Sequence, residues 1–360
     1  MRVTPPVDIL DANLTSSTAV EPHAPAAYSA GTAYSLGDIR LVAADFTIYE
    51  YLQVYDVAVT GKTPNSSPLY WRILGPTEDA YNAGTTYGLG ATVSSATTHR
   101  CYESLAAGNI GNPLPVLPET TTTKWLDVGP TNKWAAFDFS RNTQTVTASS
   151  MTLVVAPGQR CNTLGLSGMV ANSLTVSATS VTGGGTVYGP NTYDLNTREV
   201  ADGYDYAFSP FTTRPSKVLF DLPPYLDLIV TVTLTATAGN VKCGAMVLGT
   251  YVYLGTVDYH AKADSLNFST VTRDNWGNAT LIPKRGVPKT NQTLQLSSAR
   301  VSKAMDVKVA LDAKAALWTG LDDNTSDWFE LLEILGIWKQ FQFDAALPGF
   351  VDINLELEEI

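Results

Sequence analysis

Acidic side chains are the first candidates for chemistry, because hydrolysis of a glycoside needs two carboxylates at fixed positions. The chain holds 34 Asp and Glu residues, so chance pairs of acids single out no site. Glu50 and Glu103 stand at equivalent places of an internal repeat, which favours a structural role in each copy. The sequence contains no nucleophile elbow, phosphate-binding loop or metalloprotease helix motif. We therefore expect a protein that is not an enzyme and that uses no cofactor.

Two groups of residues have the donor atoms of a metal site without its spacing. The segment 322–324 (Asp-Asp-Asn) and Asp327 offer oxygen ligands to calcium, but they lack the spacing of a calcium loop. They also precede a predicted helix, where acids normally cap the first turn. His99 and Cys101 are two apart on a predicted strand and would share a face, but zinc needs further Cys or His ligands nearby. We expect no bound metal.

Composition excludes several classes of protein. Charged residues make up only 16% and the net charge is −11, whereas a sequence-independent nucleic-acid binder needs clustered Lys and Arg. No apolar stretch approaches the roughly 18–20 residues of a membrane-spanning helix, and residues 1–30 do not resemble a secretory signal. We expect no nucleic-acid partner and no membrane insertion. The odd set of three cysteines indicates reduced thiols rather than disulfides.

An internal repeat organises the first third of the chain. Four landmarks recur in constant order: the segment 27–37 at 80–90, Tyr49-Glu50 at Tyr102-Glu103, Trp71 at Trp125, and 75–77 at 129–131. Segments rich in Gly, Pro and Asn separate them, as expected between strands. The pattern predicts two copies of one small β module, at 27–77 and 78–131. A unit of this size buries little apolar area, so some of its repeated aromatic residues must form a core.

The order Tyr-x-x-Gly-x-x-Tyr-x-x-Gly, then Tyr-Glu, a Gly/Pro-rich loop and Trp, resembles the small chitin-binding type of carbohydrate-binding module, families 5 and 12. The resemblance implies a compact three-stranded module that binds polysaccharide through exposed aromatic rings. The first copy departs from the family at 54–60, where Val-Tyr-Asp-Val-Ala-Val-Thr replaces a small Ala/Asn turn.

The resemblance also implies which residues would stack on the sugar rings. The candidates are Tyr28, Tyr34, Tyr70, Trp71, Tyr81, Tyr87, Tyr102 and Trp125. For the pairs Tyr34/Tyr87 and Trp71/Trp125 a role in the core is the favoured alternative. Further aromatic candidates are Tyr49, Tyr51, Tyr55 and Trp134. Tyr51 and Tyr55 have no aromatic counterpart in the second copy, and they suit an interface.

The segments flanking the modules are similar to tail proteins of long-tailed bacteriophages. The similarity rests on 3–6 (Val-Thr-Pro-Pro), 14–22, 125–138, 249–255, 274–277 and the closing segment. Those relatives usually have Arg where Lys133 stands and Met where Ala136 stands. The resemblance implies a structural virion protein of the tail tip or baseplate, made in the cytoplasm of a bacterial host.

Residues 132–360 predict a β-rich assembly platform. Apolar runs of strand length lie at 151–156, 163–170, 173–179, 217–221, 228–237 and 243–254. The segment 231–237 alternates with period two, which is typical of a strand with one buried face. Such strands without long helices between them suggest an antiparallel sandwich or jelly roll. We also expect turns at 183–185 and 238–240, a strand at 299–311, a short helix at 328–338, and strands at 341–345 and 350–357.

The sequence thus predicts a mainly β chain with two small three-stranded modules, followed by a sandwich or jelly-roll-like platform with a short helix. Residues 1–26 are Pro-rich and hold little core-forming material, so we expect an extended arm that orders against a neighbouring subunit. We also expect residues 132–360 to fold alone after cleavage near Asn132, because the two sections have separate aromatic sets and a Gly-Pro-Thr-Asn hinge lies between them.

The expected partners are other tail or baseplate proteins, further copies of this chain, and host-surface polysaccharide bound by the modules during adsorption. One alternative is a carbohydrate-active enzyme that its modules anchor. The other is a purely structural tail protein whose modules contact other tail proteins.

Overall fold

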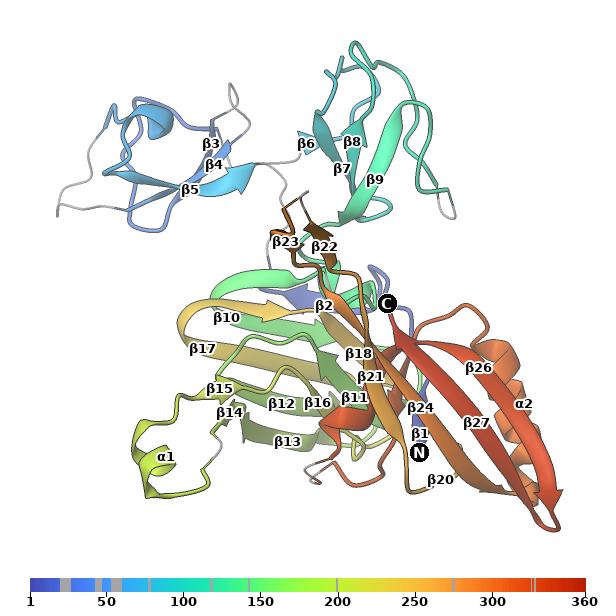
Figure 1. Ribbon diagram of the computed structural model, residues 1–360. Coiled ribbons are helices and arrows are strands. Elements are labelled where there is room, and N and C mark those ends of the chain that lie inside the picture. Colours follow the sequence, from blue (N-terminus) through green and yellow to red (C-terminus); the bar gives the residue numbers. More distant parts are fainter. Residues whose placement is uncertain are drawn as a thin grey trace. The chain divides into compact units, whose positions relative to one another are not determined.

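The computed structural model describes the whole chain except residues 20–26, 43–46, 53–59, 77–78, 117–118, 142, 199, 274–275, 325 and 327. The fold is mainly β, with two small sheets, larger antiparallel sheets and short helices (Figure 1). This confirms the predicted fold class. The chain divides into two compact units: unit 1 is Met1–Ala19 with Ala136–Ile360, and unit 2 is Val20–Ala135.

Unit 2 holds the two small modules. The sheet of module one has the order β3-β4-β5, and the sheet of module two has the order β6-β7-β8-β9. The elements are β3 (Ile39–Val42), β4 (Thr47–Tyr51), η1 (Pro64–Ser66), β5 (Trp71–Pro76), β6 (Asp79–Ala80), β7 (Thr92–Ser95), β8 (Arg100–Ser104) and β9 (Trp125–Pro130). In both modules the first segment runs parallel to the next strand, through Ala27 and Leu41 in module one and through β6 and β7 in module two.

An eight-stranded sheet dominates unit 1. Its order is β19-β1-β25-β26-β27-β24-β20, and β21 also pairs with β24. The strands are β1 (Arg2–Thr4), β19 (Val252–Tyr253), β20 (Thr256–Val257), β21 (Lys262–Asn267), β24 (Gly286–Ser297), β25 (Ala316–Thr319), β26 (Glu333–Leu347) and β27 (Phe350–Glu359). The helix α2 (Val301–Ala310) contributes Ala304 and Val307 to the same core cluster as Trp318, Ile353 and Leu355 of this sheet, so the helix covers one of its faces.

Two further antiparallel sheets complete the body of unit 1. One has the order β13-β12-β17-β10-β2 and the other β16-β11-β18. Their strands are β2 (Leu14–Ser17), β10 (Thr145–Val155), β11 (Thr163–Ser167), β12 (Ser173–Ser180), β13 (Gly185–Asp194), β16 (Lys217–Leu219), β17 (Ile229–Cys243) and β18 (Ala245–Gly249). Buried and accessible residues alternate along β12, which leaves it one core face. All residues of β11 and β18 are buried, so both faces of the smaller sheet are covered.

The remaining elements are short. They are η2 (Ala135–Phe137), β14 (Asn196–Thr197), α1 (Gly203–Phe208), β15 (Thr212–Thr213), β22 (Thr270–Arg273), β23 (Ala279–Ile282), η3 (Ser298–Arg300) and η4 (Glu330–Leu332). Among the described residues, no helix combines the length and apolarity that crossing a membrane would require.

Residues 1–19 differ from the expected arm. Val3 on β1 pairs with Val252 of β19 and with Trp318 of β25, so the strand lies inside the eight-stranded sheet. Met1 and Val3 are buried in its core, and β2 pairs with β10. A strand of three residues is too short to produce a recognisable alternation, which is why the sequence concealed it. The platform therefore includes Met1–Ala19, and 132–360 alone lacks an interior strand.

Two expectations near the C-terminus are wrong. Residues 301–310 form helix α2 instead of a strand, because Ala304, Val307 and Leu311 together line one buried helical face. The segment 328–338 forms η4 and the start of β26 instead of a helix. A methyl group on Gly336 would lie 2.0 Å from the carbonyl oxygen of Glu358, so the close approach of β27 favours glycine in this strand.

The turn expected at 238–240 also differs from the structure. These residues lie inside β17, where the register with β10 shifts between Ala148 and Ser150. Gly239 has a φ of +78°, which glycine adopts readily, so the irregularity is a bulge within a continuing strand. The turn at 183–185 does connect β12 and β13.

Candidate functional site

The aromatic residues of module two form one cluster. Trp125 and Tyr102 are fully buried and pack with Tyr87 and Val93, while Tyr81 lies half-buried against them. The ring centroids of Tyr81 and Tyr87 lie 5.8 and 5.3 Å from that of Trp125, at 88° and 70°. Edge-on contacts of this kind are favoured between aromatic rings. The cluster is therefore the core of the module.

Module one repeats this arrangement. Tyr34, Tyr49, Tyr51 and Trp71 are buried, while Tyr28 and Tyr70 lie half-buried against them. The rings of Tyr28 and Tyr34 lie 5.8 and 5.1 Å from Trp71, at 89° and 71°. These values match those around Trp125 within a few tenths of an ångström and a degree. The sequence repeat is thus also a repeat of packing geometry.

Each module holds its second tyrosine by the same pair of hydrogen bonds. The hydroxyl of Tyr34 accepts from the amide of Ser29 at 2.7 Å and donates to its carbonyl at 2.9 Å. The hydroxyl of Tyr87 does the same with Asn82, at 2.8 and 3.2 Å. Both phenol hydroxyls are hydrogen-bonded to backbone groups of a turn, so the two tyrosines have a structural role in their modules.

The hydrogen bonds of the indole nitrogens of Trp71 and Trp125 show that two loops, one in each module, are equivalent. The sequence did not show this equivalence. Trp71 donates to the carbonyl of Lys62 at 2.8 Å, and Trp125 donates to that of Asn112 at 3.0 Å. In both modules the glycine before the acceptor donates its amide to the Ala-Gly turn. Lys62 and Asn112 therefore occupy the same place, although their spacing in sequence differs from that of the other landmarks.

The structure separates the eight predicted sugar-binding residues by burial. Five are buried: Tyr34, Trp71, Tyr87, Tyr102 and Trp125. Three are half-buried: Tyr28, Tyr70 and Tyr81. Stacking on a pyranose ring requires an open aromatic face, so these three are the accessible candidates. Tyr55 lies outside the described residues.

The surroundings of the accessible rings differ between the modules. Tyr81 donates its hydroxyl to the carbonyl of Asn112 at 2.7 Å, which fixes the ring beside an amide side chain. In module one the ammonium of Lys62 lies 5.2 Å from the ring centroid of Tyr70, a cation–π contact. The ammonium of Lys62 would therefore compete with a sugar ring for the face of Tyr70.

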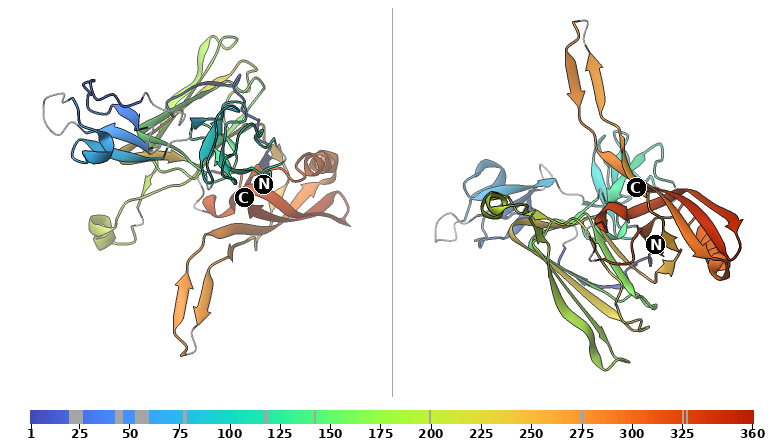
Figure 2. Two further views of the ribbon diagram at one scale, coloured as in Figure 1. Left: turned by 90° about the horizontal axis from the view of Figure 1, so that it is seen from above. Right: turned by 60° about the horizontal axis from the view of Figure 1, so that its bottom comes forward.

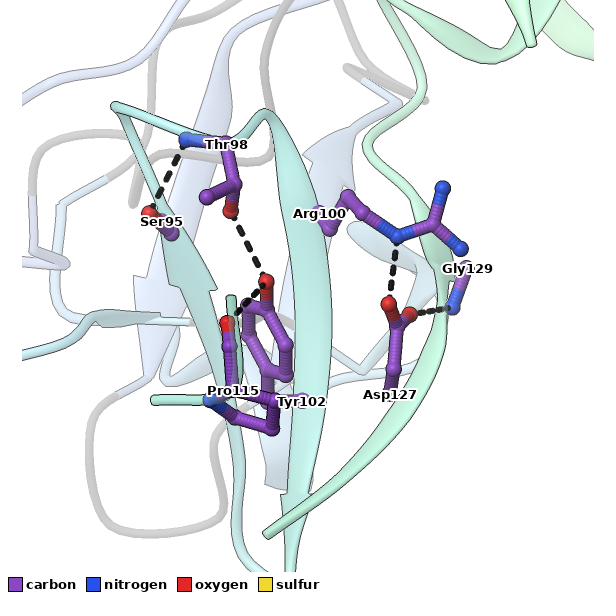
Figure 3. A network of polar contacts seen from close by, with 7 residues as sticks. All are labelled: Ser95, Thr98, Arg100, Tyr102, Pro115, Asp127 and Gly129. Atoms are coloured by element: carbon purple, nitrogen blue, oxygen red, sulfur yellow. Dashed lines mark hydrogen bonds and ion pairs between the residues drawn. The ribbon is translucent and has the colours of Figure 1, made fainter. Parts of the chain in front are cut away.

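Tyr102 anchors a polar network inside module two (Figure 3). Its hydroxyl lies 2.9 Å from the hydroxyl of Thr98 and donates to the carbonyl of Pro115 at 3.4 Å. The amide of Thr98 donates in turn to Ser95 at 3.2 Å. The network ties the β7–β8 turn to the loop that contains Pro115. Sequence reasoning placed Tyr102 among the binding residues, whereas these contacts all lie within the module.

The other polar contact in Figure 3 is an ion pair. Arg100 donates to Asp127 at 2.5 Å, and the second carboxylate oxygen accepts from the amide of Gly129 at 2.9 Å. The side chain of Asp127 is only 2% exposed. Such a buried carboxylate requires its partners, so the pair stabilises β8 against β9.

His99 and Cys101 do not share a strand face. His99 precedes β8 with a φ of +55°, and its ring stacks on Trp134 with centroids 4.1 Å apart. Cys101 is a buried thiol.

Residues 322–324, which were considered as calcium ligands, instead make contacts within unit 1. Asp322 lies 3.2 Å from the guanidinium of Arg2, and Asn324 donates to the carbonyl of Val218 at 2.8 Å. Asp327 lies outside the described residues. Across the described part of the chain, no three His, Cys, Asp or Glu side chains gather as a metal site would require.

A pocket in unit 1 carries a carboxyl group that the sequence did not reveal. The pocket has a volume of about 320 Å³ and is lined by Lys217, Glu330 and Glu333 among others. Glu333 accepts a hydrogen bond from the hydroxyl of Ser216 at 2.9 Å. Burial raises the pKa of Glu333 to about 7. The sequence around Glu333 does not indicate that this carboxyl is buried.

Comparison with known proteins adds no assignment: no protein-family model matches the chain, and no curated protein matches it.

Proposed function

We propose that this chain is a structural protein of a phage tail tip or baseplate, and that module two binds host-surface polysaccharide during adsorption. The phage assignment rests on the resemblance of the flanking segments. The glycan assignment rests on the two small modules and on Tyr81 in particular.

The observation that carries the glycan proposal is the position of Tyr81. Its ring is half-open and lies edge-on to the buried Trp125, while its hydroxyl is fixed on the carbonyl of Asn112. A rigid aromatic face loses little conformational entropy when a ligand covers it. The side-chain nitrogen of Asn112 already donates to Asn109 and to the carbonyl of Ile110, so the amide oxygen of Asn112 is the group that can accept from a sugar hydroxyl.

Binding through one such ring is weak. An aromatic stacking contact contributes about 0.5–1.5 kcal/mol, whereas a millimolar dissociation constant needs about 4 kcal/mol. A single module is therefore expected to bind in the millimolar range at best, with hydrogen bonds supplying the rest. Many copies on one particle raise the apparent affinity through avidity, because one bound module holds the others close to further binding sites. The net charge of −11 disfavours acidic polysaccharides, so neutral or amino-sugar glycans are the proposed ligands.

A pull-down on insoluble chitin tests the proposal with a matched pair of variants. Tyr81→Ala removes the half-open ring, whereas Tyr259→Ala removes a tyrosine of unit 1 that is 93% exposed. With the chains displayed in many copies on beads, as on a particle, we expect the wild type and Tyr259→Ala to be retained on chitin, and Tyr81→Ala to elute. Retention of Tyr81→Ala at the wild-type level would contradict the assignment.

A second candidate function is contact between the modules and other tail proteins. Burial of five of the eight predicted aromatic residues favours it, because it leaves few rings for sugar. A glycan array without signal on assembled particles, with antibody-accessible modules, would support this role. In that case cross-linking of the modules to tail proteins within the particle is expected.

A further inference from the structure

A long β-hairpin of unit 1 contributes almost nothing to the core. We call residues 262–286 the hairpin arm; it comprises β21, β22, β23 and the first residue of β24. Every described residue from 262 to 285 is exposed to solvent. Figure 2 shows β22 and β23 as a narrow projection from the body of the unit. A two-stranded hairpin without a covered face is marginally stable in water, so a partner that covered the arm would stabilise it.

The hairpin arm also exposes large apolar side chains. These are Leu266, Phe268, Val271, Trp276, Leu281 and Ile282. Trp276 is 86% exposed and Leu281 69%. Apolar side chains gathered on one projection mark an interaction site, and tryptophan is enriched among the residues that dominate binding energies.

A second projection of unit 1 exposes aromatic rings. We call residues 198–213 the aromatic loop; it contains α1 and follows β13, an edge strand of the five-stranded sheet. Tyr204, Tyr206, Phe208 and Phe211 are each 68–71% exposed. The guanidinium of Arg198 lies 5.0 Å from the ring of Tyr206 and 4.9 Å from that of Phe211. The loop therefore presents an ordered apolar surface.

The two projections carry opposite charge. The hairpin arm has Lys262, Arg273, Lys284 and Arg285 against two aspartates, a net charge of +2 in a chain of −11. Arg285 already pairs with the buried Glu359 of β27, so a net charge of +1 (+2 − 1) remains for a partner. The aromatic loop has Arg198 against Glu199, Asp202 and Asp205, a net charge of −2. Opposite charges on two apolar surfaces give both attraction and orientation.

We propose that the hairpin arm of one copy docks on the aromatic loop of a second copy. The arm belongs to the eight-stranded sheet and the loop follows the five-stranded sheet, so the contact joins two different surfaces of the same unit. A contact of this head-to-tail kind closes into a ring or continues as a helical filament. The aromatic loop offers the arm an apolar surface of opposite charge on the same kind of chain, and this charge complementarity favours a second copy as the partner. The proposal does not depend on glycan binding by the modules.

Sedimentation velocity of the full chain over a concentration series provides the first test. The wild type is expected to self-associate. Trp276→Ser combined with Leu281→Ser, and separately Phe208→Ser, should raise the dissociation constant about tenfold or more. Val181→Ser is the matched control, since Val181 is 90% exposed and lies outside both projections. All these side chains are exposed, so an unchanged thermal transition is expected to verify the fold.

Cysteine cross-linking tests the pairing itself. Chains with Thr280→Cys and chains with Ala207→Cys, both at exposed positions that leave the apolar side chains in place, are mixed and oxidised; the native cysteines are buried and should stay unreactive. A disulfide between the two kinds of chain is expected, and a mixture of Thr280→Cys with Val181→Cys should give none above background. A wild type that stays monomeric at all concentrations would overturn the proposal. So would equal cross-linking in both mixtures, or an association that the arm variant leaves unchanged. Binding of a monomeric wild type to lipid vesicles, lost in the arm variant, would replace the second copy by a membrane.

Discussion

Tyr51 and Ser104 occupy the same position in the two modules, but they fill it with different chemistry. Tyr51 pairs in register with Trp71, and Ser104 pairs in register with Trp125. The ring of Tyr51 lies 5.0 Å from that of Trp71. The hydroxyl of Ser104 instead accepts from the amide of Asn109 at 3.0 Å. Module one thus has an apolar filling where module two has a hydrogen-bonded side-chain network.

The network in module two reaches the candidate glycan site. Asn109 exchanges two backbone hydrogen bonds with Tyr87 and accepts from the side chain of Asn112 at 2.7 Å. Asn112 is the residue whose carbonyl holds Tyr81. The loop beside Tyr81 is therefore fixed before any ligand binds, which is why module two is the stronger candidate.

Replacement of Trp125 by Ala should unfold module two. The side chain is fully buried, and loss of a buried Trp costs about 3–5 kcal/mol, which a module of this size cannot sustain. Tyr81→Ala should leave the module folded, because its ring is half-exposed. Amide NMR dispersion of residues 79–130 measures both outcomes. A folded module with Ala at position 125 would show that the Trp is not core.

Removal of two tyrosine hydroxyls should have opposite effects on stability. The hydroxyl of Tyr51 is buried and has no hydrogen-bond partner among the described residues, so Tyr51→Phe should leave the free energy of unfolding unchanged or raise it. Tyr102→Phe removes the contacts with Thr98 and Pro115 and should cost about 1 kcal/mol. Denaturant titration of the full chain compares the two variants, and equal losses would contradict the difference.

The stability of unit 1 should fall between pH 4.5 and about 7. Burial raises the pKa of Glu333 from 4.5 to about 7, while Ser216 and Arg141 act in the opposite direction. The folded state therefore keeps a proton that the unfolded chain releases. This contribution is complete below pH 4.5 and is lost as the pH rises through the folded-state value. Its size is at most about 3 kcal/mol, and less where solvent reaches the carboxyl.

The substitution Glu333→Gln isolates this contribution. Glutamine retains an acceptor for the hydroxyl of Ser216 but cannot ionise, so the pH dependence of unfolding should flatten. Glu330→Gln is the comparison variant: Glu330 is 46% exposed and its charge adds only a minor part of the rise in the pKa of Glu333, so the slope should fall far less than in Glu333→Gln. Chemical denaturation at several pH values supplies the comparison. An unchanged slope with Gln at position 333 would assign the pH dependence to other groups.

The boundaries of unit 1 predict which shortened chains fold. A chain of residues 132–360 lacks β1, which lies between β19 and β25, and it should lose the cooperative thermal transition. Replacement of 20–135 by a flexible Gly/Ser linker retains β1 and β2 and should preserve that transition. Calorimetry distinguishes the two constructions. A cooperative transition of 132–360 equal to that of the linked chain would show that β1 is dispensable.

The sequence predicted features that repeat or alternate. The landmarks around Trp71 and Trp125 identified the two modules, and the alternation over 231–237 identified the core of β17. Prediction from the sequence failed where both faces of a strand are buried. Ile334 packs in one core cluster and Leu335 in another, so β26 has no alternation there and its apolar run is indistinguishable from a helical face.

The candidate site was predictable in its residue types but not in its accessibility. Tyr81 and Tyr87 are six positions apart in one motif, and no local pattern distinguishes the half-open ring from the buried one. Their exposure depends on a loop that differs in length between the modules and that brings Asn112 to Trp125. The surroundings of Glu333 depend on Ser216, 117 residues away, and no local sequence pattern encodes such a contact.

The most direct test of the glycan proposal is an NMR titration of the isotope-labelled full chain with chitooligosaccharide. We expect shifts of the amide signals of Tyr81, Asn112 and their neighbours, with a dissociation constant near the millimolar range. These shifts should vanish in Tyr81→Ala and persist in Tyr259→Ala. Unchanged signals of a folded module two, with this ligand and with neutral oligosaccharides, would contradict glycan binding.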